Sequence, residues 1–395
     1  MSGREDERLA RVALASLVEP GNRELGTLVA AAGAPVALAR LIAGAVPDQL
    51  AAAAAPRLAA GDPYRAAEVT LSRTERLGAR LLIPTDDEWP AQVADLATVS
   101  RADTGDRIDR DTYPPLCLWV RGGGDLGEAV ERSVAIVGAR AATEYGKHVA
   151  SEIAYGLAGR GWTVVSGGAY GIDAAAHRGA LAASGTTVAV LACGVDRPYP
   201  AGNASLFERI ADDGLLISEW PPGAAPHRHR FLIRNRVIAA STRGTVMVEA
   251  AARSGARQTL GRAVLLGRAA MVVPGPVTSA MSVGCHSAIR HFGARLVTSH
   301  LEVLEEVGRI GDDLAPLPRA QERPDDLLDP LARQVLDVVP PRRAADIDHL
   351  AAAAGVSVRD AMRALGLLDA GGFVIKTPEG YRLPPPDRTT APVAT

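Results

Sequence analysis

Aromatic residues, paired cysteines and long apolar runs are all scarce in this chain of 395 residues. Because aromatic residues make up only 4% of it, contacts in the core must come mainly from Ala, Val and Leu. The cysteines Cys117, Cys193 and Cys285 lie far apart and form no C-x-x-C pair, which excludes the usual zinc spacing and is typical of a reducing compartment. We therefore expect no bound metal.

A targeting segment and an excess of one charge are also missing. The opening segment MSGREDERLA contains no apolar stretch of the signal-peptide type, and no apolar run is long enough to span a bilayer. We therefore expect a cytoplasmic protein without membrane insertion. The formal net charge of −2 at pH 7 excludes a uniformly basic nucleic-acid binder, so any such site must be a local patch.

What the sequence does contain is a pair of strand–turn–helix patterns within 133–183. Apolar runs at 134–137 and 163–165 each end in a glycine turn that a helical pattern follows. This is a βαβα unit, in which both helices begin at the carboxyl ends of parallel strands. Backbone N–H groups at a helix start have no partner within the helix, so both turns are predicted phosphate seats.

Neither turn matches a common nucleotide motif. The turn after the first strand, which starts at Gly138, lacks the later glycines of G-x-G-x-x-G, and no G-x-x-x-x-G-K-[ST] occurs. Hydride transfer and ATP hydrolysis therefore have no sequence support, and we expect no cofactor. Arg140 stands where a pyrophosphate would need bare backbone, which predicts that its side chain holds an external anion. The second turn contains Ser166, Gly167, Gly168, Tyr170 and Gly171, and a simple tight connection remains an alternative for it.

Catalytic machinery is not evident in these turns. His177 follows Asp173 by four residues, so both lie on one helix face, and a histidine held by this carboxylate is predicted to be structural. No Ser-His-Asp order, paired catalytic carboxylates or metal cluster accompanies the pair, and Glu249 at a strand end is the only other suggestive acid. We therefore predict no catalytic residues and a protein that is not an enzyme.

The rest of the chain extends the predicted sheet and adds smaller parts. Apolar runs continue at 188–191, 215–217, 245–248 and 271–273, with helical patterns between them. The predicted fold class is α/β, with an extended Rossmann-like, doubly wound parallel sheet, a small N-terminal helical domain and a C-terminal winged-helix domain. The predicted boundaries are a helical domain at 1–76, the sheet domain at 77–310 with an exposed loop at 100–112, a linker at 311–325, the winged helix at 326–384 and a disordered tail at 385–395.

The densest positive cluster, PHRHRFLIRNR, occupies 226–236. At helical spacing Arg230 and Arg234 share a face, while Phe231 is predicted to face the sheet. A charged run is usually a solvated helix face, and this alternative stays open on composition alone. Because the run follows the carboxyl edge of the sheet, it is also a candidate anion-binding element.

Ordered segments of the chain resemble the DNA-processing protein A (DprA, Smf) family. They are VAIVGAR (134–140), SGGAYGIDAAAH (166–177), AVLACGVDRPYPAGN (189–203), SEWPPG (218–223), FLIRNRVIA (231–239), VEAAARSGARQT (248–259) and VPGPVTSAMSVGCHSAIRHFGA (273–294). The resemblance implies a homodimer that binds single-stranded DNA and loads the RecA recombinase onto it, in DNA-mediated transformation (competence) and DNA recombination. It also implies a helical N-terminal domain of the sterile-alpha-motif or helix-hairpin-helix type.

The matches to the family's motifs add residues outside the two turns to the predicted DNA-binding groove. The resemblance implies that Arg234, Asn235 and Arg236 line it together with Arg140 and the turn at 166–171, and Leu232 replaces the family's usual proline. Tyr170 stands where many members have arginine, so a base is expected to stack there in place of a phosphate contact, or else the ring packs inward and the pocket is weaker. The same resemblance adds Arg253, Ser254 and Gly255 to the groove. It assigns the dimer or RecA contact to Cys285, His286 and Ile289, and a helix of the core remains the alternative for this segment.

Two other functions remain open at the level of sequence. Lysine-decarboxylase-like nucleotide phosphoribohydrolases resemble this fold and also have an S-G-G-type loop. Their P-G-G-x-G-T-x-x-E element is missing, because the corresponding strand end reads VEAAARSG at 248–255. A regulator that binds duplex DNA through the winged helix is the other alternative, although Asp360 and Asp369 accompany the arginines of its recognition helix.

Overall fold

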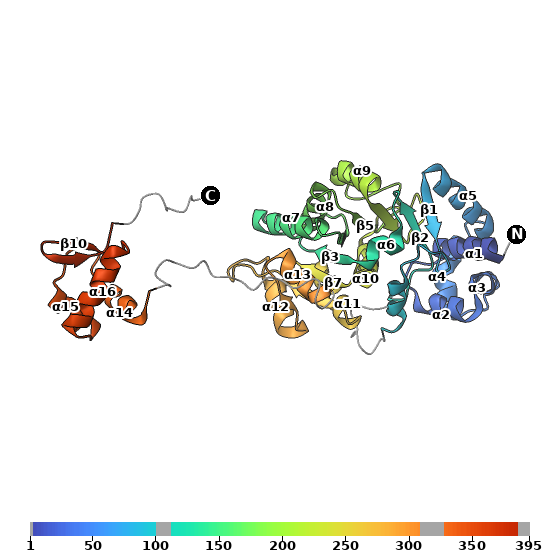
Figure 1. Cartoon of the computed structure of the whole chain (residues 1–395). Coiled ribbons are helices and arrows are strands. Elements are labelled where there is room, and N and C mark those ends of the chain that lie inside the picture. The colour runs from blue at the N-terminus through green and yellow to red at the C-terminus, as the bar shows by residue number, and fades with distance from the viewer. Residues whose placement is uncertain (1–2, 100–111, 309–327, 386–395) are drawn as a thin grey trace. The chain divides into compact units, whose positions relative to one another are not determined.

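A computed structural model describes residues 3–99, 112–308 and 328–385, which fall into two compact units, Met1–Pro316 and Leu317–Thr395. A nine-stranded sheet in the order β1-β2-β6-β5-β4-β3-β7-β8-β9 forms the centre of the first unit (Figure 1). Its strands are β1 (Ala79–Leu82), β2 (Leu118–Arg121), β3 (Ser133–Val137), β4 (Thr163–Ser166), β5 (Thr187–Leu191), β6 (Leu215–Ser218), β7 (Gly244–Met247), β8 (Ala269–Val272) and β9 (Arg295–Leu296).

In this order, all pairs between β6 and β9 are parallel, namely β6-β5, β5-β4, β4-β3, β3-β7, β7-β8 and β8-β9. At the other edge, β2 pairs antiparallel with both β6 and β1. The chain proceeds from β3 to β4, β5 and β6, and then returns to form β7 on the other side of β3. The connections after β3 and β7 therefore diverge, which opens a crevice at the carboxyl ends of these two strands. The predicted extended parallel sheet is confirmed.

Alternating side chains of the strands contact helices on both faces of the sheet. In β3, Ala135 and Val137 belong to one buried cluster, and Val134 and Ile136 belong to another, as the two-residue period of a strand requires. The first face is covered by α6 (Leu126–Glu131), α10 (Arg228–Ala240), α11 (Gly255–Leu265) and α12 (Val283–Phe292). The second is covered by α7 (Glu144–Ala158), α8 (Ile172–Ala182), α9 (Ala204–Asp213) and α13 (His300–Val307).

Five helices precede the sheet and pack at its β1–β2 edge (Figure 1). Their apolar faces share one buried cluster with Leu81 of β1 and Trp119 of β2. The boundary near residue 76 stays a prediction, because these helices and the sheet belong to one compact unit. The helices are α1 (Gly3–Leu17), α2 (Arg23–Ala32), α3 (Ala34–Ile42), α4 (Asp48–Leu58) and α5 (Pro63–Arg76), and two short 3₁₀ helices lie further on at Ala91–Ala97 and Ala201–Asn203.

Residues 328–385, the described part of the second unit, contain three helices and a hairpin with their own buried cluster. Ala345 pairs with Tyr381 and so adds a bridge to the hairpin. The elements match the order expected of a winged helix, and that assignment stays a prediction. They are α14 (Pro330–Leu336), α15 (Ile347–Ala354), α16 (Val358–Ala370), β10 (Ile375–Thr377) and β11 (Gly380–Arg382).

Several sequence predictions fall largely outside the described residues, namely the loop at 100–112, the linker at 311–325 and the tail at 385–395. Within the described ranges, no helix combines the length and the apolar character that crossing a bilayer requires. In the same ranges, no group of three or more His, Cys, Asp or Glu side chains is placed to hold a metal ion.

Candidate nucleic-acid interface

A cavity of about 640 Å³ lies at the crevice between the connections that follow β3 and β7. One wall comes from the turns after β3 and β4, another from the start of α11, and a third from α10. The structure brings together these predicted site residues: Gly138, Arg140, Arg234, Asn235, Arg253, Ser254 and Gly255. Segments more than 100 residues apart in the sequence thus form one concave site at the place where open α/β sheets bind ligands.

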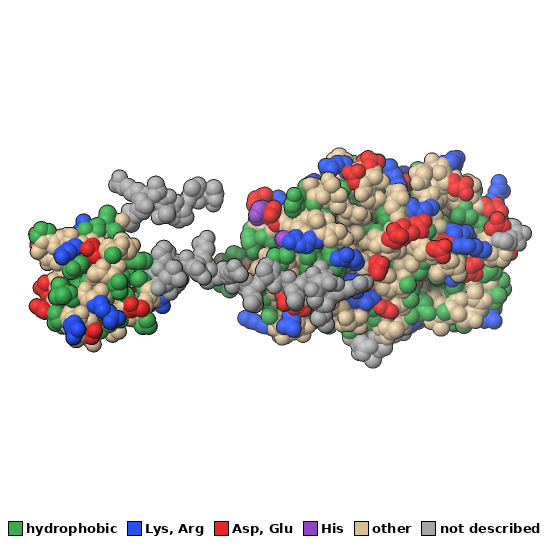
Figure 2. All heavy atoms as spheres, viewed as in Figure 1, with side chains coloured by type: hydrophobic (Ala, Val, Ile, Leu, Met, Phe, Trp, Pro, Cys, Tyr) green, Lys and Arg blue, Asp and Glu red, His purple; other side chains and the backbone are tan. Residues whose placement is uncertain are grey.

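Exposed arginines surround this cavity. Arg140, Arg228 and Arg253 are exposed, and none of them forms an ion pair with any residue that the structure describes. Figure 2 shows Lys and Arg side chains interspersed with Asp and Glu on the drawn face of the first unit. The cavity is therefore a local cationic site on a molecule with a slightly negative net charge.

Arg234 forms part of the cavity lining but is itself buried. Its Nη1 donates to the carbonyl oxygen of Gly167 at 2.8 Å and to that of Val190, and its Nε donates to Oδ1 of Asn235 at 3.1 Å. Burial lowers its pKa to about 10 against the opposing effect of Asp173, so the guanidinium keeps its charge at neutral pH. Arg234 contributes a buried positive charge, whereas the charge of Arg140 is exposed.

Phe231 provides an aromatic surface inside the cavity and also packs against Ala192 and Trp220, which follow β5 and β6. The guanidinium carbon of Arg140 lies 4.9 Å from its ring centroid, and that of Arg234 lies 5.9 Å away. Tyr199 is another lining residue, which the sequence did not indicate. Its ring is tilted by 59° relative to that of Phe231, and the two ring centroids are 5.8 Å apart. A helical signal was available, because the lining residues Phe231, Arg234, Asn235 and Ile238 follow the spacing of one helix face.

The start of α7 is not a free phosphate seat, because the carboxylate of Glu249 occupies it. Oε2 of Glu249 accepts from the backbone N–H of Thr143 at 2.9 Å, and Oε1 accepts from the Thr143 hydroxyl at 2.6 Å. The Thr143 hydroxyl oxygen in turn accepts from the N–H of Gly146 at 3.1 Å and caps the helix. The sequence prediction of an anion site at these amides is wrong, since an internal anion is already bound there.

The turn after β4 is filled in the same way. The carboxylate of Asp173 accepts from the backbone N–H of Ala169 at 3.4 Å and from that of Gly167. Gly171 has φ of 77° and lies directly against the carbonyl oxygen of Ala139, so its missing side chain serves contact between the two turns. Ser166 is fully buried and donates to the carbonyl oxygen of Ile136 at 2.6 Å. Gly167, Gly168 and Gly171 are not part of the cavity lining; a side chain at Gly167 would meet Arg234 and one at Gly168 would meet Phe207, so these glycines permit close packing behind the lining.

Two further predicted DNA contacts lie outside the cavity lining. Arg236 has no exposed surface, and its Nη2 donates to Oε1 of Glu219 at 2.6 Å while its Nε donates to the carbonyl oxygen of Tyr113 at 2.9 Å. A guanidinium that is buried against an internal carboxylate does not reach a phosphate, so its assignment to the groove is wrong. Tyr170 is 48% exposed and lies beside Gly202, away from the cavity lining.

The residues predicted to contact a partner differ in exposure. Cys285 is fully buried near the carbonyl oxygens of Met247 and Val248, and burial raises the pKa of its thiol to about 12. A side chain in this position belongs to the core, so its assignment to a dimer or RecA contact is wrong. Ile289 is 36% exposed on α12, and His286 is partly exposed next to the carbonyl oxygen of Gly275.

His177 lies in the core and outside the cavity lining. It has no exposed surface, and its Nδ1 is 2.7 Å from the hydroxyl of Thr187, so its partner is Thr187 and not Asp173 as the sequence predicted. Burial lowers its pKa to about 3, which keeps the ring neutral at physiological pH. Its position suits a structural role.

The fold and the site together define a doubly wound α/β protein with an arginine-lined and aromatic crevice at the switch point of its sheet. Residues 80–308 match the family model described as "DNA recombination-mediator protein A". The chain belongs to this family of DNA-processing recombination mediators.

Individual relatives agree with this membership. The chain is 46% identical over 363 residues to the "Putative DNA processing protein DprA" of Mycobacterium tuberculosis, covering 91% of this chain and 90% of that protein. It is 35% identical to "Protein Smf" of Escherichia coli, with 76% of each chain covered. The X-ray structure of DNA processing protein A from Streptococcus pneumoniae superposes with a TM-score of 0.61 at 29% identity, covering 77% of this chain and 98% of that one. These matches confirm the predicted family and do not favour the phosphoribohydrolase alternative.

Proposed function

We propose that this chain binds single-stranded DNA in the crevice and, as a homodimer, loads RecA onto it. Membership of the recombination-mediator family supports a role in DNA processing and recombination, and uptake of DNA by natural transformation is the process in which we place it. In this proposal the protein acts in the cytoplasm and catalyses no reaction.

The observation that carries the proposal is that the exposed Arg140, Arg228 and Arg253 line the same cavity as the ring of Phe231, on which Arg140 stacks. Arginine guanidinium groups bind phosphate oxygens in a bidentate way and stay charged at any physiological pH. Aromatic rings stack with unpaired bases and contribute about 1–3 kcal/mol per base. Bases in a duplex are already stacked and paired, so this combination favours a single strand.

The homodimer and the RecA contact rest on different support. They follow from family membership together with the exposed Ile289 and the partly exposed His286 of α12. Light scattering on the purified protein measures the number of chains per particle, and a mass of one chain at micromolar concentration would remove the homodimer from the proposal.

Fluorescence anisotropy with labelled oligonucleotides tests the proposed ligand. We expect a single strand to bind more tightly than a hairpin duplex of the same composition. We also expect log affinity to fall with log salt by about 0.7 per neutralised phosphate. Equal affinity for both forms would contradict a site that reads unpaired bases.

Phe231→Ala is expected to lower single-strand affinity by about 1–3 kcal/mol, because the substitution removes the ring on which a base stacks. The slope of log affinity against log salt should stay unchanged, since no phosphate contact is lost. Tyr155→Ala is the matched control, because Tyr155 is an exposed aromatic residue of α7 outside the cavity lining. An affinity loss shared by both variants would refute the stacking role.

Tyr170→Ala is also expected to lower single-strand affinity without changing the salt slope. The effect should be smaller than that of Phe231→Ala, because the half-exposed ring of Tyr170 lies outside the cavity lining. The same anisotropy titration measures it. Binding identical to that of the unaltered protein would remove Tyr170 from the site.

A further inference from the structure

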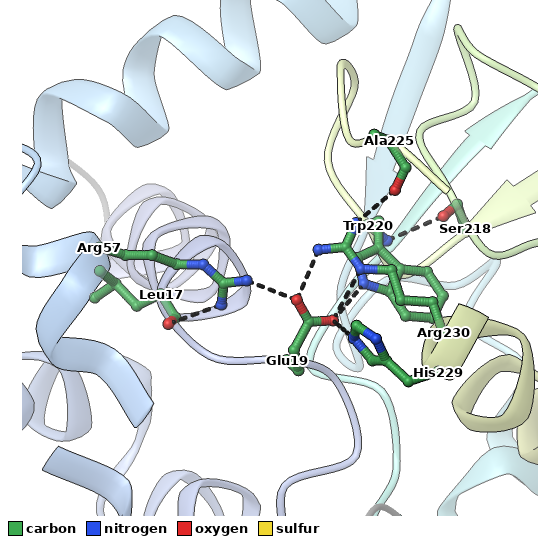
Figure 3. A network of polar contacts seen from close by, with 8 residues as sticks. All are labelled: Leu17, Glu19, Arg57, Ser218, Trp220, Ala225, His229 and Arg230. Carbon is green, nitrogen blue, oxygen red and sulfur yellow. Dashed lines mark hydrogen bonds and ion pairs between the residues drawn. The ribbon is translucent and has the colours of Figure 1, made fainter. Parts of the chain in front are cut away.

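The carboxylate of Glu19, in the turn between α1 and α2, connects the N-terminal helices to the start of α10 (Figure 3). Its Oε1 accepts from Nη2 of Arg230 and from Nη2 of Arg57, both at 2.6 Å. Its Oε2 accepts from Nε1 of Trp220 at 2.9 Å and from Nε of Arg230 at 3.1 Å. One carboxylate therefore joins α4, the segment after β6 and α10.

Arg230 is the member of this cluster that belongs to the crevice helix. Its remaining Nη1 donates to the carbonyl oxygen of Ala225 at 2.9 Å, and its guanidinium carbon lies 5.5 Å from the ring centroid of Trp220. The side chain is buried and is absent from the cavity lining. Arg230 therefore anchors the helix rather than offering a charge to the strand.

The anchored turn carries the residues that line the cavity. Arg228 and Phe231 lie on either side of Arg230 in the first turn of α10, and Arg234 follows one turn later. The helix lacks the usual side-chain cap, because His227 makes no capping hydrogen bond. The two hydrogen bonds from Arg230 to Glu19 tie this uncapped turn to the N-terminal helices, in addition to the bond from Arg230 to Ala225.

The Glu19 carboxylate stays ionised at physiological pH. Burial alone would raise its pKa, but hydrogen bonds from Arg230, Trp220 and Arg57 lower it to about 2. Each of its two oxygens accepts two hydrogen bonds, so losing the charge weakens all four contacts together.

We propose that Glu19 is a positioning residue for strand binding, through which the N-terminal helices fix the first turn of α10 and with it the Phe231 surface. This inference rests on the proposed function. It assigns the N-terminal helices a role in the affinity of a site whose lining contains none of their residues.

Glu19→Gln separates positioning from simple electrostatics by the sign of its effect. Removal of a negative charge near a site for a polyanion raises affinity if the carboxylate acts only through its field. If Glu19 positions α10, the affinity for single-stranded DNA falls, and we expect a loss of about fivefold or more. The salt slope should stay unchanged, because neither Glu19 nor Arg230 contacts a phosphate.

The matched control is Asp86→Asn. Asp86 binds Arg4 at 2.7 Å and Arg8 at 2.6 Å, so it forms a comparable carboxylate cluster, but it lies outside the lining of the crevice cavity. We expect this variant to bind single-stranded DNA as the unaltered protein does. Glu19→Asp, which keeps the charge on a shorter side chain, should restore part of the affinity that Glu19→Gln loses.

Hydrogen exchange of the full chain without DNA keeps this test separate from the proposed function. In Glu19→Gln the backbone amides of the first turn of α10 should exchange faster, while those of α11 stay unchanged. Unaltered exchange in α10, or single-strand affinity equal to or above that of the unaltered protein, overturns the inference. Faster exchange in a protein that binds no single-stranded DNA upholds the anchoring by Glu19 and refutes the proposed function.

Discussion

Single-strand affinity falls about tenfold or more when Arg140 is replaced by Ala, because a charge-assisted hydrogen bond to phosphate contributes about 1.5–3 kcal/mol. Arg140 is exposed, forms no ion pair with the described residues and stacks on Phe231 at 4.9 Å, so its guanidinium is held ready for an outside anion. The slope of log affinity against log salt should decrease by about 0.7, the value for one phosphate contact. Anisotropy titrations at several salt concentrations measure both quantities.

Arg132→Ala is the control for this substitution. Arg132 is likewise exposed and stacks on an aromatic ring, that of Trp162 at 5.2 Å, but it does not line the cavity. We expect its removal to leave affinity and slope within error of the unaltered protein. Equal effects of both substitutions would mean that only the overall charge matters, and an unchanged slope in Arg140→Ala would argue against the crevice.

Arg236→Ala lowers the free energy of unfolding by about 3–5 kcal/mol, because it leaves the carboxylate of Glu219 buried without its partner. The two side chains are 0% and 3% exposed, so water does not replace the lost hydrogen bonds. Urea denaturation monitored by tryptophan fluorescence measures the change, since Trp220 directly follows Glu219 in the chain.

Replacing both partners distinguishes a structural arginine from a DNA contact. The double variant Arg236→Met with Glu219→Met leaves no unpaired charge and should regain most of the lost stability. Its single-strand affinity should show the same salt slope as the unaltered protein. A reduced slope together with unchanged stability would restore the sequence-based assignment of Arg236 to the groove.

The sheet was predictable because its signals are local. Apolar runs such as 134–137 and 188–191 are long enough for buried strands, and the glycine turns after them mark where helices begin. The structure places strands at Ser133–Val137 and Thr187–Leu191, within a residue of these runs. The same local rules could not reveal that β1 and β2 pair antiparallel at the edge.

Which residues line the site was harder to predict, because a basic run does not show where each side chain points. Arg234 and Arg236 are only two residues apart, which on a helix turns them to different sides. Arg234 reaches the cavity, while Arg236 meets Glu219 in the core. The sequence offered no reason to pair Arg236 with this particular acid.

Local sequence patterns could not predict that internal carboxylates bind at the helix starts, because the partners lie far apart in the chain. Glu249 reaches the amide of Thr143 across 106 positions of sequence, and Glu19 reaches Arg230 across 211. A glycine turn has the same sequence whether its amides bind an external phosphate or an internal carboxylate. Only the spatial arrangement distinguishes the two.

The central claim is that exposed arginines around an aromatic surface bind the phosphates of an unpaired strand. The most direct measurement is the salt dependence of single-strand binding by a variant in which Arg140, Arg228 and Arg253 are all replaced by Ala. We expect the log–log slope to decrease by about 2, three contacts at about 0.7 each, while the fold is retained. A folded triple variant that binds single-stranded DNA with the unaltered slope would contradict the claim.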